Sequence, residues 1–181
     1  MLITTERLIL RSWRDSDAPS LYTYAKDPDV GPIAGWPPHQ SEEASLQVIR
    51  TVLNGLECYA VCRKEDGLAI GAAELILSPR LARNEHECEL GFWLGKPFWG
   101  RGYMPEASRA LLSRAFEELG MTAVWCAYFE GNTKSRRVQE KLGFVPERVI
   151  PDFEVPLFGE KRVCYVNLLT AEQWSAARKT R

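Results

Sequence analysis

The feature that most constrains the fold is a strand that runs into a glycine-bearing turn and then into a long helix. Residues 87–94 predict a central strand that ends in the apolar Phe92-Trp93-Leu94, and residues 95–102 hold three glycines. Pro105 suits the first turn of a helix, and Gly120 suits the position after its last turn. Residues 122–129 then predict a second strand. Because a helix connects them, the two strands are predicted to lie parallel in one sheet.

Further elements are predicted on both sides of this unit. Alternating side chains predict an opening strand over residues 6–13, and residues 57–64 and 68–77 predict an antiparallel hairpin around Asp66-Gly67. Residues 161–169 predict a last strand. Residues suited to cap a helix N-terminus precede three helical segments: Ser41, Asn132 and Thr170. We therefore expect a mixed α/β sheet in a single domain over residues 1–181.

Charge and cysteine content exclude several classes of partner. The 181 residues carry a formal net charge of −1, which offers no field to attract nucleic acid or an anionic membrane. The five cysteines do not form matched Cys-x-x-Cys pairs, so we expect reduced thiols and no metal site. No apolar stretch approaches membrane-spanning length, and the N-terminus has no signal-peptide pattern. We expect a cytoplasmic protein.

The glycine turn is predicted to hold an anion. Gly100 and Gly102 let the backbone turn tightly, and the helix that follows points its positive end at the same place. Pro105 stands where a dinucleotide-binding motif needs glycine, and Pro97 stands where a P-loop needs a hydroxyl, so both of these motifs are excluded. A merely compact strand-to-helix connection remains the alternative.

Two longer segments resemble a known family. Residues 90–107, from Leu-Gly-Phe-Trp to Met-Pro-Glu-Ala, and residues 132–144, from Asn-Thr-Lys-Ser to Lys-Leu-Gly-Phe, resemble the signature regions of the GNAT superfamily of N-acetyltransferases. The opening Thr5-Glu-Arg-Leu-Ile-Leu-Arg-Ser-Trp13 is similar to the start of its RimJ/RimL ribosomal-protein branch. The resemblance implies a mixed, mostly antiparallel central sheet with one splayed parallel pair, flanked by helices. It leaves a homodimer open.

The resemblance also implies acetyl-coenzyme A as co-substrate, with no metal. The pyrophosphate of coenzyme A is expected on the glycine turn, and the pantetheine arm is expected along the end of the strand predicted over residues 87–94. Trp99 and Met104 depart from the usual residues, which recognition by backbone amides tolerates. The implied cofactor-binding residues are Phe92, Trp93, Leu94, Trp99, Gly100, Arg101, Gly102, Tyr103, Met104, Asn132, Ser135 and Arg137. Phe92 and Trp93 are equally typical of a buried core strand, and the charged side chains are equally typical of a solvated helix face.

Transfer to an amine needs a base, and the thiolate that leaves benefits from an acid. Glu89 is the first candidate for the base and Glu74 the second, although either suits a solvated or ion-paired strand position as well. The tyrosine that many family members carry is replaced by Gln139, whereas Ser135 matches the serine of the RimJ/RimL branch and becomes the candidate acid. Ser135 and Asn132 are also explained by helix capping alone.

The acceptor amine is expected beside two irregular segments, one at residues 27–39 and one that holds Asp152 and Glu154. Residues 27–39 hold four prolines and two glycines, and Trp36 within them is expected to contact the acceptor together with Glu74. Four acids are expected to flank the acceptor and attract its positive charge, or to be ordinary loop polarity: Asp27, Asp29, Asp152 and Glu154.

These observations predict an N-acetyltransferase that works by direct attack in a ternary complex. The acceptor is either a protein N-terminus or a small-molecule amine, and the sequence does not choose between them. The alternative from a different class is a coenzyme A-binding sensor without turnover, which needs the glycine turn but neither Glu89 nor Ser135.

Overall fold

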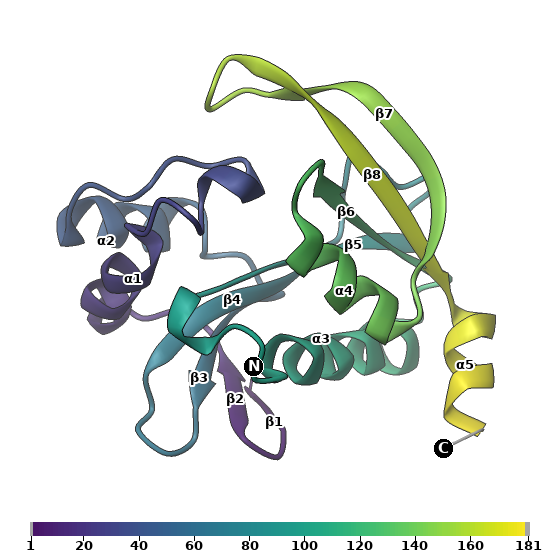
Figure 1. Cartoon of the computed structure of the whole chain (residues 1–181). Helices are drawn as coiled ribbons and strands as arrows, with labels where there is room; N and C mark the ends of the chain where they lie inside the picture. Colours follow the sequence, from purple (N-terminus) through teal and green to yellow (C-terminus); the bar gives the residue numbers. More distant parts are fainter. Residues whose placement is uncertain (1, 180–181) are drawn as a thin grey trace.

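The computed structural model describes residues 2–179 as a sheet flanked by helices (Figure 1). Within these residues the sheet has eight strands in the order β1-β2-β3-β4-β5-β6-β8-β7. The strands are β1 Leu2–Thr4, β2 Leu8–Arg11, β3 Cys58–Arg63, β4 Ala69–Ile76, β5 Glu87–Leu94, β6 Ala123–Phe129, β7 Val145–Val155 and β8 Glu160–Thr170. Neighbouring strands pair antiparallel except β5 and β6, which are parallel. The predicted fold class is confirmed; the ends of the predicted domain, residues 1 and 180–181, lie outside the described residues.

Five α-helices flank the sheet within the described part of the chain. They are α1 Ala18–Ala25, α2 Glu42–Thr51, α3 Tyr103–Ser113, α4 Thr133–Leu142 and α5 Ala171–Lys179. A π-helical turn, Arg114–Glu118, continues α3, and short 3-10 turns occur at Asp15–Asp17, Pro32–Ala34 and Lys96–Phe98. Among residues 2–179, none of the helices combines the length and the apolar character that crossing a bilayer requires.

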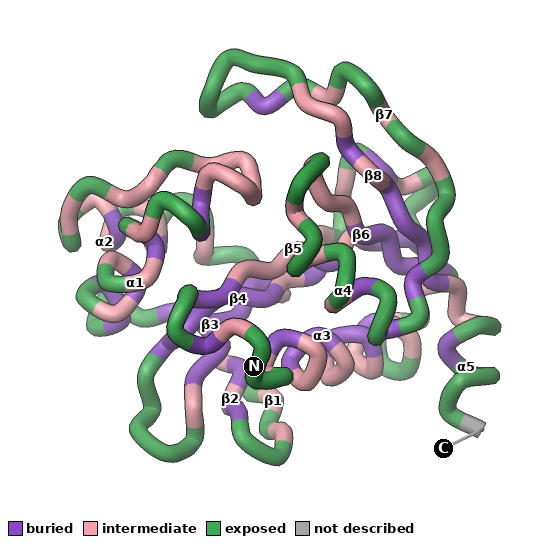
Figure 2. Tube along the Cα trace, in the orientation of Figure 1, coloured by how far each residue is buried: buried purple, intermediate pink, exposed green. Residues whose placement is uncertain are grey.

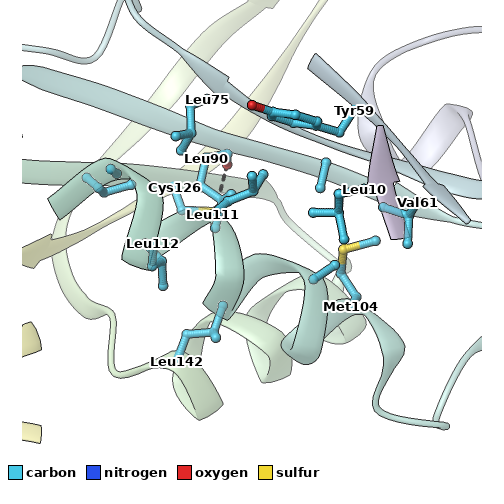
Figure 3. Close-up of a cluster of buried hydrophobic side chains, with 14 of the residues drawn as sticks. Leu10, Tyr59, Val61, Leu75, Leu90, Met104, Leu111, Leu112, Cys126 and Leu142 are labelled. Carbon is cyan, nitrogen blue, oxygen red and sulfur yellow. Dashed lines mark hydrogen bonds between the residues drawn. The ribbon is translucent and has the colours of Figure 1, made fainter. Parts of the chain in front are cut away.

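The two faces of the sheet bury different side chains because neighbouring residues of a strand point to opposite faces. On β3, Cys58 and Ala60 pack with α1 and α2, whereas Tyr59 and Val61 pack with α3. Figure 3 shows the cluster that contains Tyr59 and Val61, in which Leu111 of α3 lies among side chains from several strands. Helices therefore cover both faces, and the centre of the sheet is buried (Figure 2).

The predicted helix starts are confirmed by their hydrogen bonds. The Ser41 hydroxyl accepts from the Ala44 backbone N–H at 3.1 Å, and the Asn132 side chain accepts from the Ser135 N–H at 3.1 Å. Thr170 and Gln173 exchange two hydrogen bonds in the predicted capping box. Local sequence therefore determines where α2, α4 and α5 begin.

Two parts of the predicted element order are wrong. The opening strand is only Leu8–Arg11, and a separate strand β1 precedes it. Asp152 and Glu154, expected in an irregular segment, lie on strand β7. The register of β7 against β8 shifts twice, so its side chains do not alternate as in a regular strand. β7 is also an edge strand of the sheet and is largely exposed (Figure 2). An edge position tolerates prolines, which in a sequence argue against a strand.

Candidate active site

Two cavities meet at the end of strand β5. The larger has a volume of about 1100 Å³ and lies between the 95–102 turn, the start of α3 and helix α4. The smaller has a volume of about 290 Å³ and lies between the middle strands and the segment 27–39. Six residues line both cavities: Ile33, Ala34, Phe92, Trp93, Asn132 and Ser135. A molecule in the larger cavity can therefore present a group to a molecule in the smaller one.

Strand β5 separates from β6 at this junction and leaves part of its backbone available. The two strands pair only over Glu87–Glu89, after which β6 continues along β8. The Leu90 carbonyl faces the β6 side, where it accepts from the Cys126 thiol at 3.1 Å (Figure 3). The Gly95 N–H faces β4, where it donates to the Ile70 carbonyl at 2.8 Å. Since backbone groups alternate sides along a strand, the N–H and C=O of Phe92 face the gap between β5 and β6.

The glycine turn presents open backbone at the start of α3. Gly100 and Gly102 have φ of 75° and 79°, a conformation that favours glycine, and a Cβ added at Gly100 would meet nothing within 4 Å. The Arg7 guanidinium supports the turn from behind by donating to the Arg101 carbonyl at 2.9 Å. Glu106 of α3 holds that guanidinium at 2.7 Å. The turn is therefore held by side chains, while its N–H side remains accessible.

Arg7 and Glu106 also fix the N-terminus of the chain to α3. The Glu106 carboxylate accepts from the Thr5 hydroxyl at 2.6 Å and from the Arg7 N–H at 2.8 Å. Burial alone would raise the pKa of Glu106, but these hydrogen bonds outweigh it, and the pKa lies below its ordinary value. The carboxylate therefore stays ionised and keeps its hold on Arg7 down to lower pH than an ordinary glutamate would.

Helix α4 supplies the opposite wall of the larger cavity. Asn132 and Ser135 stand in its first turn, and Arg137 and Lys141 line the cavity further along. The Lys134 ammonium lies 4.3 Å from the centre of the Trp99 ring, and both residues line the cavity. Basic side chains thus gather where the glycine turn faces α4, an arrangement suited to an anionic ligand.

The residues expected to bind coenzyme A are brought together by the fold with one exception. Those that line the larger cavity are Phe92, Trp93, Leu94, Trp99, Gly100, Gly102, Tyr103, Met104, Asn132, Ser135 and Arg137. Arg101 is not among the lining residues, and its carbonyl faces Arg7. The implied role of Arg101 in cofactor binding stays a prediction.

Glu74 and Glu89 share the smaller cavity on adjacent strands. Glu74 lies opposite Gly91 in the β4–β5 register, two residues from Glu89 on the same face. A Cβ at Gly91 would lie 2.9 Å from the Glu74 Oε1, so the carboxyl of Glu74 lies over the bare backbone of Gly91. Within the described residues, no lysine or arginine lines this cavity. The two carboxyls therefore form an acidic site without a neutralising partner.

The surroundings hold both carboxyls at raised pKa. Burial, and then the nearby charge of Glu74, raises the pKa of Glu89 from 4.5 to about 7. Burial also raises the pKa of Glu74, although a hydrogen bond with the Cys58 thiol partly opposes this. A carboxyl that titrates near neutral pH is well suited to exchange protons with a substrate.

Ser135 lines both cavities, as expected for a group near the reacting atoms. Its hydroxyl oxygen accepts a hydrogen bond from the Gln139 side chain at 3.1 Å. Gln139 is fully buried and stands where the family's tyrosine was expected. The structure thus replaces a possible acid by an amide that contacts the neighbouring hydroxyl.

Trp36 lies in the smaller cavity, edge-on to Trp93 with ring centres 5.6 Å apart. Its segment, 27–39, covers the junction of the two cavities through Ile33 and Ala34. The acids expected to flank the acceptor do not gather there. Asp29 lines the larger cavity and pairs with Lys96 at 2.5 Å, whereas Asp27, Asp152 and Glu154 line neither cavity. The acidic character of the smaller cavity comes from Glu74 and Glu89 instead.

Sequence reasoning missed the support of the turn by Arg7 and Glu106. Their separation of 99 residues leaves no spacing pattern that a single sequence can reveal. The signal that was present is the Thr5-Glu-Arg7 opening, which supported the family resemblance without indicating a role for the arginine.

Comparisons with known proteins agree with this geometry. A family profile described as "Acetyltransferase (GNAT) domain" matches residues 7–145. YdaF of Bacillus subtilis (strain 168), provisionally named a ribosomal N-acetyltransferase, is 37% identical over 95 residues, which cover 52% of this chain and 49% of YdaF. The uncharacterized N-acetyltransferase p20 of Bacillus licheniformis is 26% identical over 156 residues, covering 83% of this chain and 85% of p20. The crystal structure of a GNAT-family acetyltransferase from Bacillus anthracis has the same fold, with a TM-score of 0.82 at 24% identity over 95% of this chain and 99% of that one.

Proposed function

Because the chain belongs to the GNAT family of acetyltransferases, we propose that it transfers the acetyl group of acetyl-coenzyme A to a primary amine by direct attack in a ternary complex. The observation that carries the proposal is the meeting of two unlike cavities at the splayed end of β5. One is large, with a glycine turn and basic side chains; the other is small, apolar and acidic.

The residues around the larger cavity fit coenzyme A. Gly100 has open space where a side chain would stand, so an anionic group can approach the backbone amides at the start of α3. Lys134, Arg137 and Lys141 supply positive charge nearby. The free N–H and C=O of Phe92 can pair with an extended arm that carries amides, as an added strand would. Acetyl-coenzyme A supplies the activated acetyl group when it is bound there.

The residues around the smaller cavity fit an amine. A protonated amine is attracted by the Glu74 and Glu89 carboxyls, and only its neutral form can attack the thioester. Glu89, with a pKa of about 7, can accept the proton that the amine loses. Ser135, which lines both cavities, can donate a hydrogen bond to the sulfur of the leaving group. A coenzyme A-binding sensor would need neither this carboxyl nor this hydroxyl.

The lining of the smaller cavity supports a proposal for the class of acceptor. Apart from the two acids the lining is mainly apolar and aromatic, including Trp36, Phe129 and Phe153. Its volume of about 290 Å³ admits a small amine or a single terminal residue. An α-amino group, with a pKa of ~8, is deprotonated more easily than a lysine side chain, with a pKa of ~10.4. We therefore propose a protein N-terminus or a small apolar amine; the name of YdaF supports the first.

The test is release of coenzyme A thiol from acetyl-coenzyme A with a panel of acceptors. The panel holds short peptides that differ in their first residue, the same peptides with blocked N-termini, and small amines with and without an aromatic group. If the acceptor is a protein N-terminus, we expect turnover with the free peptides but not with the blocked ones. If it is a small amine, we expect turnover with the apolar amines. No turnover with any acceptor, together with a rise in melting temperature on adding coenzyme A, would favour the sensor instead.

A further inference from the structure

Gln139 is a polar residue buried on helix α4 next to Ser135. It faces inward from α4 with no exposed surface. Burying an amide is costly unless it is hydrogen-bonded, and Gln139 makes three side-chain hydrogen bonds. Its Nε2 contacts the Ala127 carbonyl at 3.3 Å and the Ser135 Oγ at 3.1 Å, and its Oε1 accepts from Asn167 at 2.8 Å.

The orientation of this amide is determined by its partners. The Ala127 carbonyl can only accept, so the Gln139 atom that faces it is the NH₂ nitrogen. The Gln139 oxygen then faces Asn167, whose NH₂ donates to it. Reversing the Gln139 amide would place its oxygen against the Ala127 carbonyl, leaving both acceptors without a donor.

The orientation of the Gln139 amide restricts the direction in which the Ser135 hydroxyl can point. Because Gln139 donates to the Ser135 oxygen, the Ser135 hydrogen cannot point back at Gln139. Within residues 2–179, the Ser135 hydroxyl donates to no protein acceptor. Ser135 lines both cavities, so its hydrogen is left to point into their junction.

We propose that Gln139 is a positioning residue: buried between Asn167 and Ser135, it directs the Ser135 O–H toward the sulfur of coenzyme A. The proposal rests on the proposed function. Negative charge builds on that sulfur as the thioester bond breaks, and an O–H that already points there stabilises the charge without reorganising. No proton has to leave Ser135. An apolar residue at 139 would leave the hydroxyl free to rotate and to bond elsewhere.

The test measures the thiol itself rather than turnover. In the binary complex with coenzyme A, the pKa of the bound thiol is followed by the ultraviolet absorbance of its thiolate as a function of pH. The variants are Gln139→Met, Ser135→Ala and the double variant, with Gln47→Met on the exposed face of α2 as the chemically matched control. Melting temperatures establish that each variant is folded, and Gln139→Leu replaces Gln139→Met if the latter is not.

We expect Gln139→Met and Ser135→Ala each to raise the pKa of the bound thiol by about one unit, a tenfold change in thiolate stability. The double variant should match Ser135→Ala, because Gln139 acts only through Ser135. Affinity for coenzyme A at a pH where the thiol is protonated should stay within about threefold, since the pyrophosphate contacts are unchanged. Gln47→Met should match the wild type.

Two results would overturn the proposal: a thiol pKa unchanged by Gln139→Met, or additive effects in the double variant. The first would make Gln139 a core residue alone, and the second would give it a role independent of Ser135. Failure of the proposed function looks different. Suppose that the variants shift the pKa of the bound thiol as expected, but the wild type, although it binds coenzyme A, transfers acetyl to no amine. This result would refute the proposed reaction and support the role of Gln139.

Discussion

Replacing Glu74 by glutamine should move the pH dependence of the reaction to lower pH. The pKa of Glu89 rises from 4.5 to about 7, and burial contributes more to this than the charge of Glu74. Glu74 therefore accounts for at most about one pH unit of the difference. Removing its charge lets Glu89 ionise at lower pH, because a like charge no longer opposes ionisation.

The assay is kcat/KM for thiol release, divided at each pH by the fraction of neutral amine, so that the acceptor's own titration does not contribute. Wild-type activity should fall below a midpoint near pH 7, where Glu89 becomes protonated. In Glu74→Gln this midpoint should lie up to about one pH unit lower. In Glu89→Gln the acidic limb near pH 7 should vanish and the rate above it should drop about 100-fold. Glu85→Gln, an exposed residue, is the control.

An unmoved midpoint in Glu74→Gln would refute the coupling of the two carboxyls. An acidic limb near pH 7 that persists in Glu89→Gln would refute Glu89 as the base. Either result would also contradict the assignment of the smaller cavity as the acceptor site, because the two acids are what suit it to an amine.

Three further substitutions test the rest of the site. Gly102→Val forces a branched side chain into a backbone with φ of 79° and should weaken coenzyme A binding at least about tenfold by calorimetry; unchanged affinity would contradict the turn assignment. Arg7→Met removes the donor to the Arg101 carbonyl and should weaken coenzyme A about tenfold without altering the amine KM, whereas an effect on the amine alone would contradict its role in the turn. Trp36→Ala should raise the amine KM about tenfold and leave coenzyme A affinity within about twofold, and the opposite pattern would place Trp36 on the cofactor side.

Most of the fold could be predicted because its signals are local. The Asp66-Gly67 hairpin, the cap at Asn132 and the strand–turn–helix unit each depend on residues close in sequence, and each is confirmed. The family profile likewise confirms the family that the two signature segments resembled. Strand β7 could not be predicted because its pairing is irregular and is supplied by β8 rather than by its own sequence.

The parts of the candidate site that could be predicted are those formed by continuous segments of the chain. The glycine turn and the first turn of α4 are continuous segments, and all their expected residues except Arg101 face one cavity. The pairing of Glu74 with Glu89 depends instead on the register of β4 against β5, which the ten residues between the strands leave undetermined. The contact of Gln139 with Asn167 likewise joins two elements whose packing is set by the whole fold.

Strand β5 carries two carboxyls on one face, and their surroundings differ. Glu87 is buried and accepts hydrogen bonds from the Arg83 N–H, the Asn84 side chain and the Trp125 indole, which suits a structural anchor. Glu89, two residues on, accepts no hydrogen bond from the described residues, and its pKa of about 7 records the cost of ionising it there. Between pH 4.5 and 7 the folded state holds a proton that the unfolded chain has lost, so the free energy of unfolding falls as pH rises through this window.

Above pH 7, ionisation of Glu89 lowers the free energy of unfolding by about 3 kcal/mol, and nothing in the described structure offsets this cost at Glu89 itself. Glu89→Gln should therefore raise the free energy of unfolding by up to this amount at pH 8 and by little at pH 4, measured in urea. Equal effects at both pH values would show that Glu89 is not held in a costly state. A carboxyl that weakens the fold under the conditions in which it is ionised is explained by what the ionised form does, and in the proposed reaction that is to take a proton from an amine.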